Sequence, residues 1–121
     1  MHEIASVVLA IFLLVAGVVH GVAPARVQSL VPEWWPAKRA TVYLSGLAEL
    51  VLGVGLLVAS TRATAGLLAA VLFVAYAGVH ADDARHARTA TTRFGSPLGV
   101  TGRVLANLGY AAWAGYVAVG G

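Results

Sequence analysis

The chain has 121 residues, of which 60% are hydrophobic and only 11% are charged, and it contains no cysteine. Soluble domains carry about 25% charged residues, so this composition excludes an ordinary soluble domain and indicates a membrane protein. The absence of cysteine also excludes disulfide bonds, thiol redox chemistry and thiolate metal ligands.

Four apolar blocks follow one another along the chain, at residues 4–23, 41–60, 63–81 and 98–119. Each has about the 17–25 residues that a transmembrane helix needs. Their leucine, alanine and glycine content, without period-two alternation, favours helices over a β-barrel. The first block lacks the basic segment of a signal peptide, so we expect it to be retained. We expect an all-α, integral membrane four-helix bundle, antiparallel and up-down, that occupies residues 1–121 as a single transmembrane domain.

The connection between the first two blocks has a pattern of its own. Val27, Leu30 and Val31 fall at helical spacing, with polar residues on the opposite face. This pattern predicts a short segment that lies in the membrane interface. The indoles of Trp34 and Trp35 suit the depth of the lipid headgroups. The segment can be a lid over a cavity between the helices, or a membrane anchor without a further role.

The cations are unevenly distributed between the two sides of the expected bundle. The connection after the first block carries Arg26, Lys38 and Arg39, and the one after the third carries Arg85, Arg88 and Arg93. The opposite side has only Arg62. Because lysine and arginine concentrate on the cytoplasmic side, we expect a multi-pass protein of a prokaryotic inner (plasma) membrane with N- and C-termini outside. Membrane lipid explains the net charge of +3 more simply than nucleic acid, which we do not expect as a partner.

The most unusual residue is Glu49, a carboxylate inside the second apolar block. A charge at the bilayer centre costs about 2.5–3.5 kcal/mol on insertion scales, and such a residue usually faces a partner or water. Ser45 and Gly53 stand four residues before and after it, and small residues let helices approach closely. We therefore expect Glu49 to face the interior of the bundle.

Polar residues on the other three blocks are placed to meet this carboxylate. They are His20 on the first block, Tyr76 and His80 on the third, and Arg103 and Asn107 on the fourth. In an up-down bundle with a rise of about 1.5 Å per residue, all of them fall in the cytoplasmic half or near the midplane. We expect them to form one inward-facing pocket.

Several kinds of chemistry fit such a pocket. Two imidazoles and a carboxylate can ligate zinc or iron, but His20, His80 and Glu49 lack the spacing of a helical ligand pair, which disfavours a metal. The two histidines can ligate a haem, but no haem-attachment motif supports it. Histidine and tyrosine can hydrogen-bond the carbonyl oxygens of a quinone headgroup while the carboxylate relays protons. Alternatively, the polar side chains pair across helices and fix the register of the bundle without a ligand.

A second cluster lies at the end of the third block. His80, Asp83 and His86 share one helix face at a spacing of three residues. They can form a superficial metal site, or they can be the solvated end of that helix, which we favour.

Part of the chain, residues 18–68, resembles the DoxX-like family of small four-helix membrane proteins. The resemblance rests on His20-x-x-x-Pro24, on the run from Tyr43-Leu44-Ser45-Gly46 to Glu49, on Gly53-x-Gly55-Leu56-Leu57 and on Arg62. In the carboxyl half, Tyr76-Ala77-Gly78-Val79 stands where the family often has Phe-Pro-Ala-Asn, and Asn107 stands where it has Gln. The resemblance implies a membrane protein linked to redox metabolism.

Placement and resemblance together predict a small subunit or accessory of a membrane redox system that binds a quinone-like ligand. Glu49 would be the catalytic, proton-accepting group. The expected ligand-binding residues are His20, Tyr43, Ser45, Tyr76, His80, Arg103 and Asn107. Expected partners are other membrane or peripheral redox proteins, or further copies of the chain in a homo-oligomer. Whether anything is turned over is left open.

Two other classes of function remain open. The first is a non-catalytic structural or assembly subunit of a membrane protein complex. The second is a small proton-coupled transporter, which would also use a buried carboxylate. In small multidrug exporters that carboxylate lies on the first helix and the loops are short. Here Glu49 lies on the second block, after a long connection that contains tryptophan.

Overall fold

A computed structural model describes residues 2–29, 31, 35–86 and 97–120, and within these ranges the chain contains five helices and no strand. The helices are α1 (His2–Val22), α2 (Pro24–Gln28), α3 (Lys38–Leu57), α4 (Arg62–His86) and α5 (Pro97–Gly120). The prediction of an all-α chain is confirmed. Among the residues singled out from the sequence, Leu30, Trp34, Arg88 and Arg93 lie outside the described residues.

Three helices are long and apolar enough to cross a membrane: α1, α3 and residues Arg62–Asp82 of α4. Their outward faces carry large apolar side chains that are exposed, such as Ile11, Leu47 and Val71. Soluble monomers rarely expose so much contiguous apolar surface, whereas lipid tails would cover it at no cost. These features are consistent with a membrane protein. That α5 also crosses the membrane stays a prediction.

The helix boundaries differ from the predicted blocks mainly in α4, which continues from Ala81 to His86. This last stretch is polar but contains neither glycine nor proline. The helix therefore continues beyond the point where the side chains become polar, because these residues still favour a helical backbone. Pro24 begins α2, a position that suits its fixed φ and its missing N–H.

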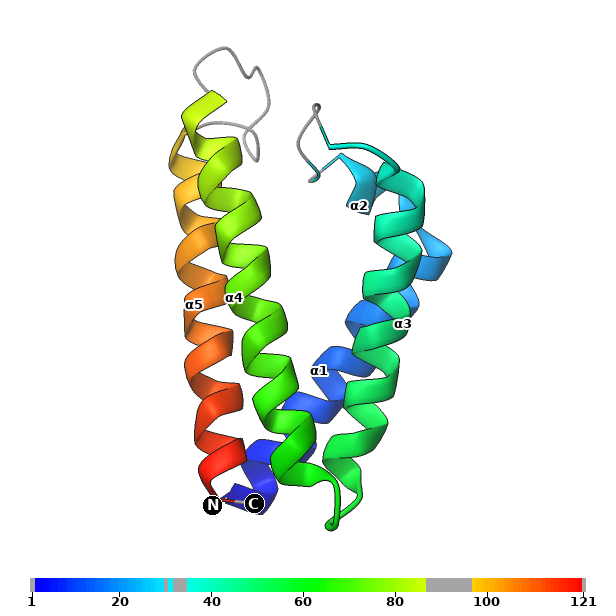
Figure 1. Cartoon of the computed structure of the whole chain (residues 1–121), viewed down its shortest axis with the longest axis vertical. Helices are drawn as coiled ribbons and strands as arrows, with labels where there is room; N and C mark the ends of the chain where they lie inside the picture. The colour runs from blue at the N-terminus through cyan, green and yellow to red at the C-terminus, as the bar shows by residue number, and fades with distance from the viewer. Residues whose placement is uncertain (1, 30, 32–34, 87–96, 121) are drawn as a thin grey trace.

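The helices pack in two pairs, α1 along α3 and α4 along α5, with less extensive contacts between α3 and α4 and between α1 and α5. Figure 1 shows that the pairs lie close together at one end of the molecule and diverge toward the end that carries α2. At the end where the pairs meet, the His2 and Tyr116 rings stack with centroids 3.9 Å apart. The start of α1 therefore lies against the end of α5.

Where the pairs meet, the hydrophobic core and several polar contacts hold all four long helices together. Leu9, Leu13, Leu56 and Val117 are fully buried there. The Leu56 carbonyl, near the C-terminus of α3, accepts hydrogen bonds from Ser6 Oγ (2.9 Å) and Arg62 Nε (3.0 Å). Helix C-termini leave carbonyls without intrahelical donors, so these bonds satisfy a group that would otherwise be buried unpaired.

Two further contacts complete this region. Trp113 Nε1 on α5 donates to the Ala5 carbonyl on α1 (3.1 Å). A Cβ on Gly66 would lie 2.9 Å from the backbone nitrogen of Ala118, so only glycine lets α4 approach α5 this closely. We call this region, defined by Ser6, Leu56, Arg62, Gly66 and Trp113, the closed end.

Glycines also bring α1 against α3 beside the predicted site. A Cβ on Gly46 would lie 2.5 Å from His20 Cβ, and one on Gly17 would lie 2.8 Å from the Gly46 carbonyl oxygen. Gly53 packs on Leu14 in the same way, which confirms that the small-residue stripe of α3 faces the interior. The glycines therefore determine how closely His20 approaches α3.

Candidate functional site

Between the diverging helix pairs lies a cavity of about 720 Å³ whose lining is mostly apolar. Cavities that bind small molecules measure about 300–1,000 Å³ and combine an apolar wall with a few polar groups. All five helices contribute to this lining. The residues among them with a polar side-chain group are His20, Trp35, Thr41, Ser45, Glu49, Tyr76, His80, Asn107 and Tyr110. We call this region of the molecule, with α2, the open end.

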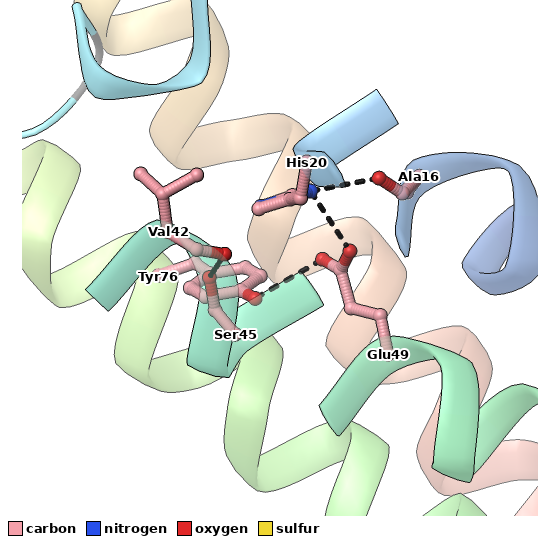
Figure 2. Close-up of polar contacts among 6 residues, drawn as sticks. All are labelled: Ala16, His20, Val42, Ser45, Glu49 and Tyr76. Atoms are coloured by element: carbon pink, nitrogen blue, oxygen red, sulfur yellow. Dashed lines mark hydrogen bonds and ion pairs between the residues drawn. The ribbon is translucent and has the colours of Figure 1, made fainter. Parts of the chain in front are cut away.

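Glu49 is the centre of a first polar cluster in the cavity wall, shown in Figure 2. Its side chain is 3% exposed, which confirms that it faces the interior. Tyr76 Oη on α4 donates to Glu49 Oε1 at 3.0 Å. His20 Nδ1 on α1 lies 3.2 Å from Glu49 Oε2. Two helices, α1 and α4, thus each place one side chain against the carboxylate that α3 carries.

The position of the proton on His20 follows from its second contact. His20 Nδ1 also lies 2.7 Å from the Ala16 carbonyl oxygen, one turn earlier on α1. A carbonyl oxygen can only accept, so Nδ1 carries a proton and donates it there. In neutral imidazole, Nε2 is then an acceptor. His20 also lines the cavity, so its ring connects the carboxylate cluster with the cavity.

Glu49 Oε2 is buried and has no hydrogen-bond partner in the part of the chain that the structure describes. Its closest polar neighbour, His20 Nδ1, directs its proton to the Ala16 carbonyl. Most buried polar atoms in folded proteins are hydrogen-bonded, and each exception calls for a physical explanation. Oε2 lies on a residue that lines the cavity, where a proton or the polar group of a ligand would satisfy it.

A second polar cluster links α4 and α5 on the same cavity. Arg103 Nη1 lies 3.4 Å from His80 Nδ1, and Asn107 Nδ2 donates to the Arg103 carbonyl at 2.8 Å. Since a guanidinium can only donate, His80 Nδ1 is the acceptor and its proton lies on Nε2. The sequence predicted one point of convergence; the structure instead forms two clusters around one cavity, because Asn107 turns back to its own helix and does not reach Glu49.

The structure places the predicted site residues in two groups. Six of them line the cavity: His20, Ser45, Glu49, Tyr76, His80 and Asn107. Ser45 Oγ itself donates to the Val42 carbonyl at 3.1 Å. The other two, Tyr43 and Arg103, are not part of the lining. Tyr43 is 42% exposed, and its ring lies 5.8 Å from the Arg39 guanidinium. Arg103 contacts His80 instead of the cavity.

Several lining residues were not among the predicted ligand-binding residues. Phe12 and Phe73 pack against Tyr110, with ring centroids 4.7 and 5.4 Å away, and separate the cavity from the core of the closed end. Trp35 Nε1 donates to Thr41 Oγ1 at 2.8 Å. In a uniformly apolar helix, the sequence does not show whether an aromatic side chain faces lipid or the cavity, because both surroundings favour the same side chains.

The connection between α1 and α3 contributes apolar side chains to the cavity. Val27 on α2 and Val31 after it both belong to the lining. This placement supports a segment that covers the cavity, the first of the two interpretations of its sequence pattern. The remaining members of that pattern, Leu30 and Trp34, lie outside the described residues.

In the described part of the chain, no group of three or more histidine, aspartate, glutamate or cysteine side chains is placed to hold a metal ion. The side chains of Asp83 and His86, which would complete a surface site with His80, lie outside what the structure describes. The superficial metal site therefore stays a prediction.

Comparison with known proteins assigns the chain to a family without assigning a function. No match is found among curated proteins, and none is found among solved structures. The sequence model of one family, described as a domain of unknown function (DUF8561), matches residues 9–118. This match includes α2, α3 and α4 completely and most of α1 and α5, so the chain belongs to the DUF8561 family.

Proposed function

We propose that the protein binds a quinone-like ligand in the cavity of the open end, as a small subunit or accessory of a membrane redox system. The single observation that carries this proposal is Glu49: a buried carboxylate in the wall of an apolar cavity, with Oε2 left without a hydrogen bond among the described residues. The neighbouring Tyr76 and His20 would set its geometry.

The unsatisfied oxygen favours a ligand site over a purely structural role. A polar network that only fixes helix register is stabilising when each member is satisfied, and a partly satisfied network destabilises a core. Asn107, the amide that could have completed such a network, bonds the backbone of its own helix. A buried acid with one oxygen left without a hydrogen bond is better explained by chemistry in the cavity.

The shape and donors of the cavity fit the chemistry of a quinone. Phe12, Phe73 and Tyr110 form an aromatic wall for a flat ring. His80, held by Arg103 on α5, also lines the cavity and places an imidazole where a ring carbonyl would lie. Reduction of a quinone to a quinol takes up two electrons and two protons; a redox partner protein would supply the electrons, and Glu49 would accept and return protons.

The proposed membrane placement completes this function. We propose an antiparallel four-helix bundle in a prokaryotic inner membrane, with the open end toward the cytoplasm and both termini outside. Arg26, Lys38 and Arg39 lie at the open end, where lysine and arginine are expected on the cytoplasmic side. Measured along α3 from Lys38 at about 1.5 Å per residue, Glu49 lies roughly 16 Å below the start of the helix.

A relationship to the DoxX-like family belongs to the same proposal. Four of the residues on which that resemblance rests, His20, Leu44, Ser45 and Glu49, line the cavity. A link between the DUF8561 family and redox metabolism would follow from that relationship, and the ligand experiment tests it directly.

The test is saturable binding of a short-tailed ubiquinone analogue to the purified protein in lipid nanodiscs. In Glu49→Gln, which keeps the shape of the side chain, we expect affinity to fall about tenfold or more, because a charge-assisted contact is lost. Tyr43→Phe is the matched control, since Tyr43 lies on the same helix but outside the cavity. Absence of saturable binding, or equal binding by both variants and the wild type, would contradict the proposal.

A further inference from the structure

A second, more open pocket of about 550 Å³ lies between α3 and α4. Its lining consists only of alanine, valine and leucine side chains, among them Leu47, Val51, Leu68 and Val71, which are exposed on the outer surface. We call it the α3–α4 groove. It lies where the two helix pairs diverge, as the separation of α3 and α4 in Figure 1 makes visible.

The groove adjoins the cavity of the open end. Leu44 on α3 and Leu72 and Ala75 on α4 belong to the lining of both. These shared side chains form the boundary between a space that contains Glu49 and one that faces outward. A molecule with a polar head in the cavity would therefore have to pass only these side chains to extend between α3 and α4.

We propose that the α3–α4 groove is a binding subsite for the tail of the cavity ligand, and that this ligand is an amphiphile with a long hydrocarbon or isoprenoid chain that enters laterally from the bilayer. The inference rests on the proposed function and adds the substrate class and the route of entry. The observation that supports this inference is the set of side chains that the groove and the cavity share.

The chemistry of the groove selects its occupant. Its lining offers no side-chain donor or acceptor, so a peptide or a headgroup would leave its own polar groups unsatisfied there. Along α3, the distance from Leu44 to Val51 is roughly 10 Å at the rise of an α-helix, more than ring substituents alone can fill. A flexible apolar chain satisfies both conditions.

The first experiment locates the tail directly. The probe is a long-tailed ubiquinone with a photoreactive diazirine at the end of its tail, bound to the wild-type protein in nanodiscs, and the cross-linked residues are mapped by mass spectrometry. We expect cross-links within residues 44–52 and 68–75, and we expect a tail-free ubiquinone to compete them away. Cross-links spread over the outer faces of all the helices, with headgroup binding retained, would overturn the tail subsite and leave the proposed function intact.

The second experiment blocks the groove and compares ligands that share one headgroup. Ala48→Phe adds a ring inside the groove, and Val71→Phe does so at an exposed position that is safer for folding. Ala112→Phe on α5, exposed and outside both pockets, is the matched control. Dissociation constants are expressed as mole fractions in the bilayer, so that the partitioning of long tails into lipid cancels.

We expect the two groove variants to weaken binding of the long-tailed ubiquinone about tenfold, because the added ring occupies the space of the tail. Binding of the tail-free ubiquinone should be unchanged in both, and the control variant should bind both ligands as the wild type does. Equal effects on the two ligands would overturn the tail subsite. If no ubiquinone binds saturably to any variant or to the wild type, both the subsite and the proposed function are overturned.

Discussion

The closed end and the open end satisfy buried polar groups in opposite ways. At the closed end, the Leu56 carbonyl accepts from both Ser6 and Arg62, so one acceptor has two donors. At the open end, the carboxylate of Glu49 has two oxygens, and Oε2 has no hydrogen bond among the described residues. The same short chain thus fills both lone pairs of a backbone carbonyl in one region and leaves a side-chain oxygen without a hydrogen bond in another.

This difference is what the proposed function would lead us to expect, with one region that stabilises the fold and another that binds the ligand. Apolar packing and shared hydrogen bonds make the closed end the region where the four long helices are fastened together. The open end contains the cavity and Glu49. The closed end supplies the stability that offsets the cost of leaving Glu49 Oε2 without a hydrogen bond. Sites of function are where natural proteins depart from the rules that local packing otherwise follows.

The largest effect should come from crowding the closed end. Gly66→Val would place side-chain atoms against the Ala118 backbone nitrogen, which lies 2.9 Å from the position of a Cβ. Backbone cannot shift as a flexible side chain can, so we expect the free energy of unfolding in detergent to fall by about 3 kcal/mol. Gly78→Ala is the open-end counterpart, since nothing lies within 4 Å of its Cβ position.

We expect Gly78→Ala to change stability by about +0.5 to +1 kcal/mol, because alanine favours the helix over glycine. Denaturation followed by circular dichroism measures both variants. If the two glycine substitutions have equal effects, α4 does not depend on close approach at the closed end, and the distinction between the two regions fails.

The next effect separates binding from stability at Glu49. Because the proposed role of this acid is in the cavity, Glu49→Gln should reduce ubiquinone affinity about tenfold while changing the free energy of unfolding by less than about 1 kcal/mol. The amide can still accept from Tyr76. Binding and unfolding are measured on the same preparation. Strong destabilisation with unchanged affinity would show that Glu49 has a structural role and not a role in binding.

A smaller effect tests the shared carbonyl of the closed end. Ser6→Ala and Arg62→Met each remove one of the two donors to Leu56, and each should cost about 1 kcal/mol of unfolding free energy. The double variant leaves that carbonyl with neither, so its cost should exceed the sum of the two by about 0.5 kcal/mol or more. A double-mutant cycle measures this excess. Simple additivity would show that the two donors act on the helix end independently.

The smallest effect compares two tyrosines that the sequence treated alike. Tyr76→Phe removes the donor to Glu49 Oε1 and should lower stability by about 1 kcal/mol, with a matching loss of affinity. Tyr43→Phe removes a hydroxyl outside the cavity and should stay within about 0.5 kcal/mol of the wild type. Thermal unfolding and ubiquinone binding distinguish the pair. Loss of affinity in Tyr43→Phe would place the ligand outside the cavity described here.

Sequence patterns were sufficient for the helical class and for the direction of a few residues. The small residues of α3 correctly predicted that Glu49 faces the interior. Small residues are needed where two helices meet closely, as Gly46 and Gly53 do against α1. The patterns were insufficient for Tyr43, which shares α3 with Glu49 but points to Arg39. The spacing of Tyr43 from Glu49 along α3 does not by itself show whether Tyr43 lies in the interior or on the adjacent outer face.

By itself, the sequence determined that this chain forms apolar helices of membrane-spanning length, that one of them buries an acid, and that no thiol takes part. Only the tertiary structure decided that the polar residues divide into two clusters, that Phe12 and Phe73 join the cavity wall, and that a groove lies beside the cavity between α3 and α4. The physical reason is that length and hydropathy are properties of one segment. Rotation and tilt arise only when helices pack on one another, and in a uniformly apolar chain little else distinguishes one helix face from the next.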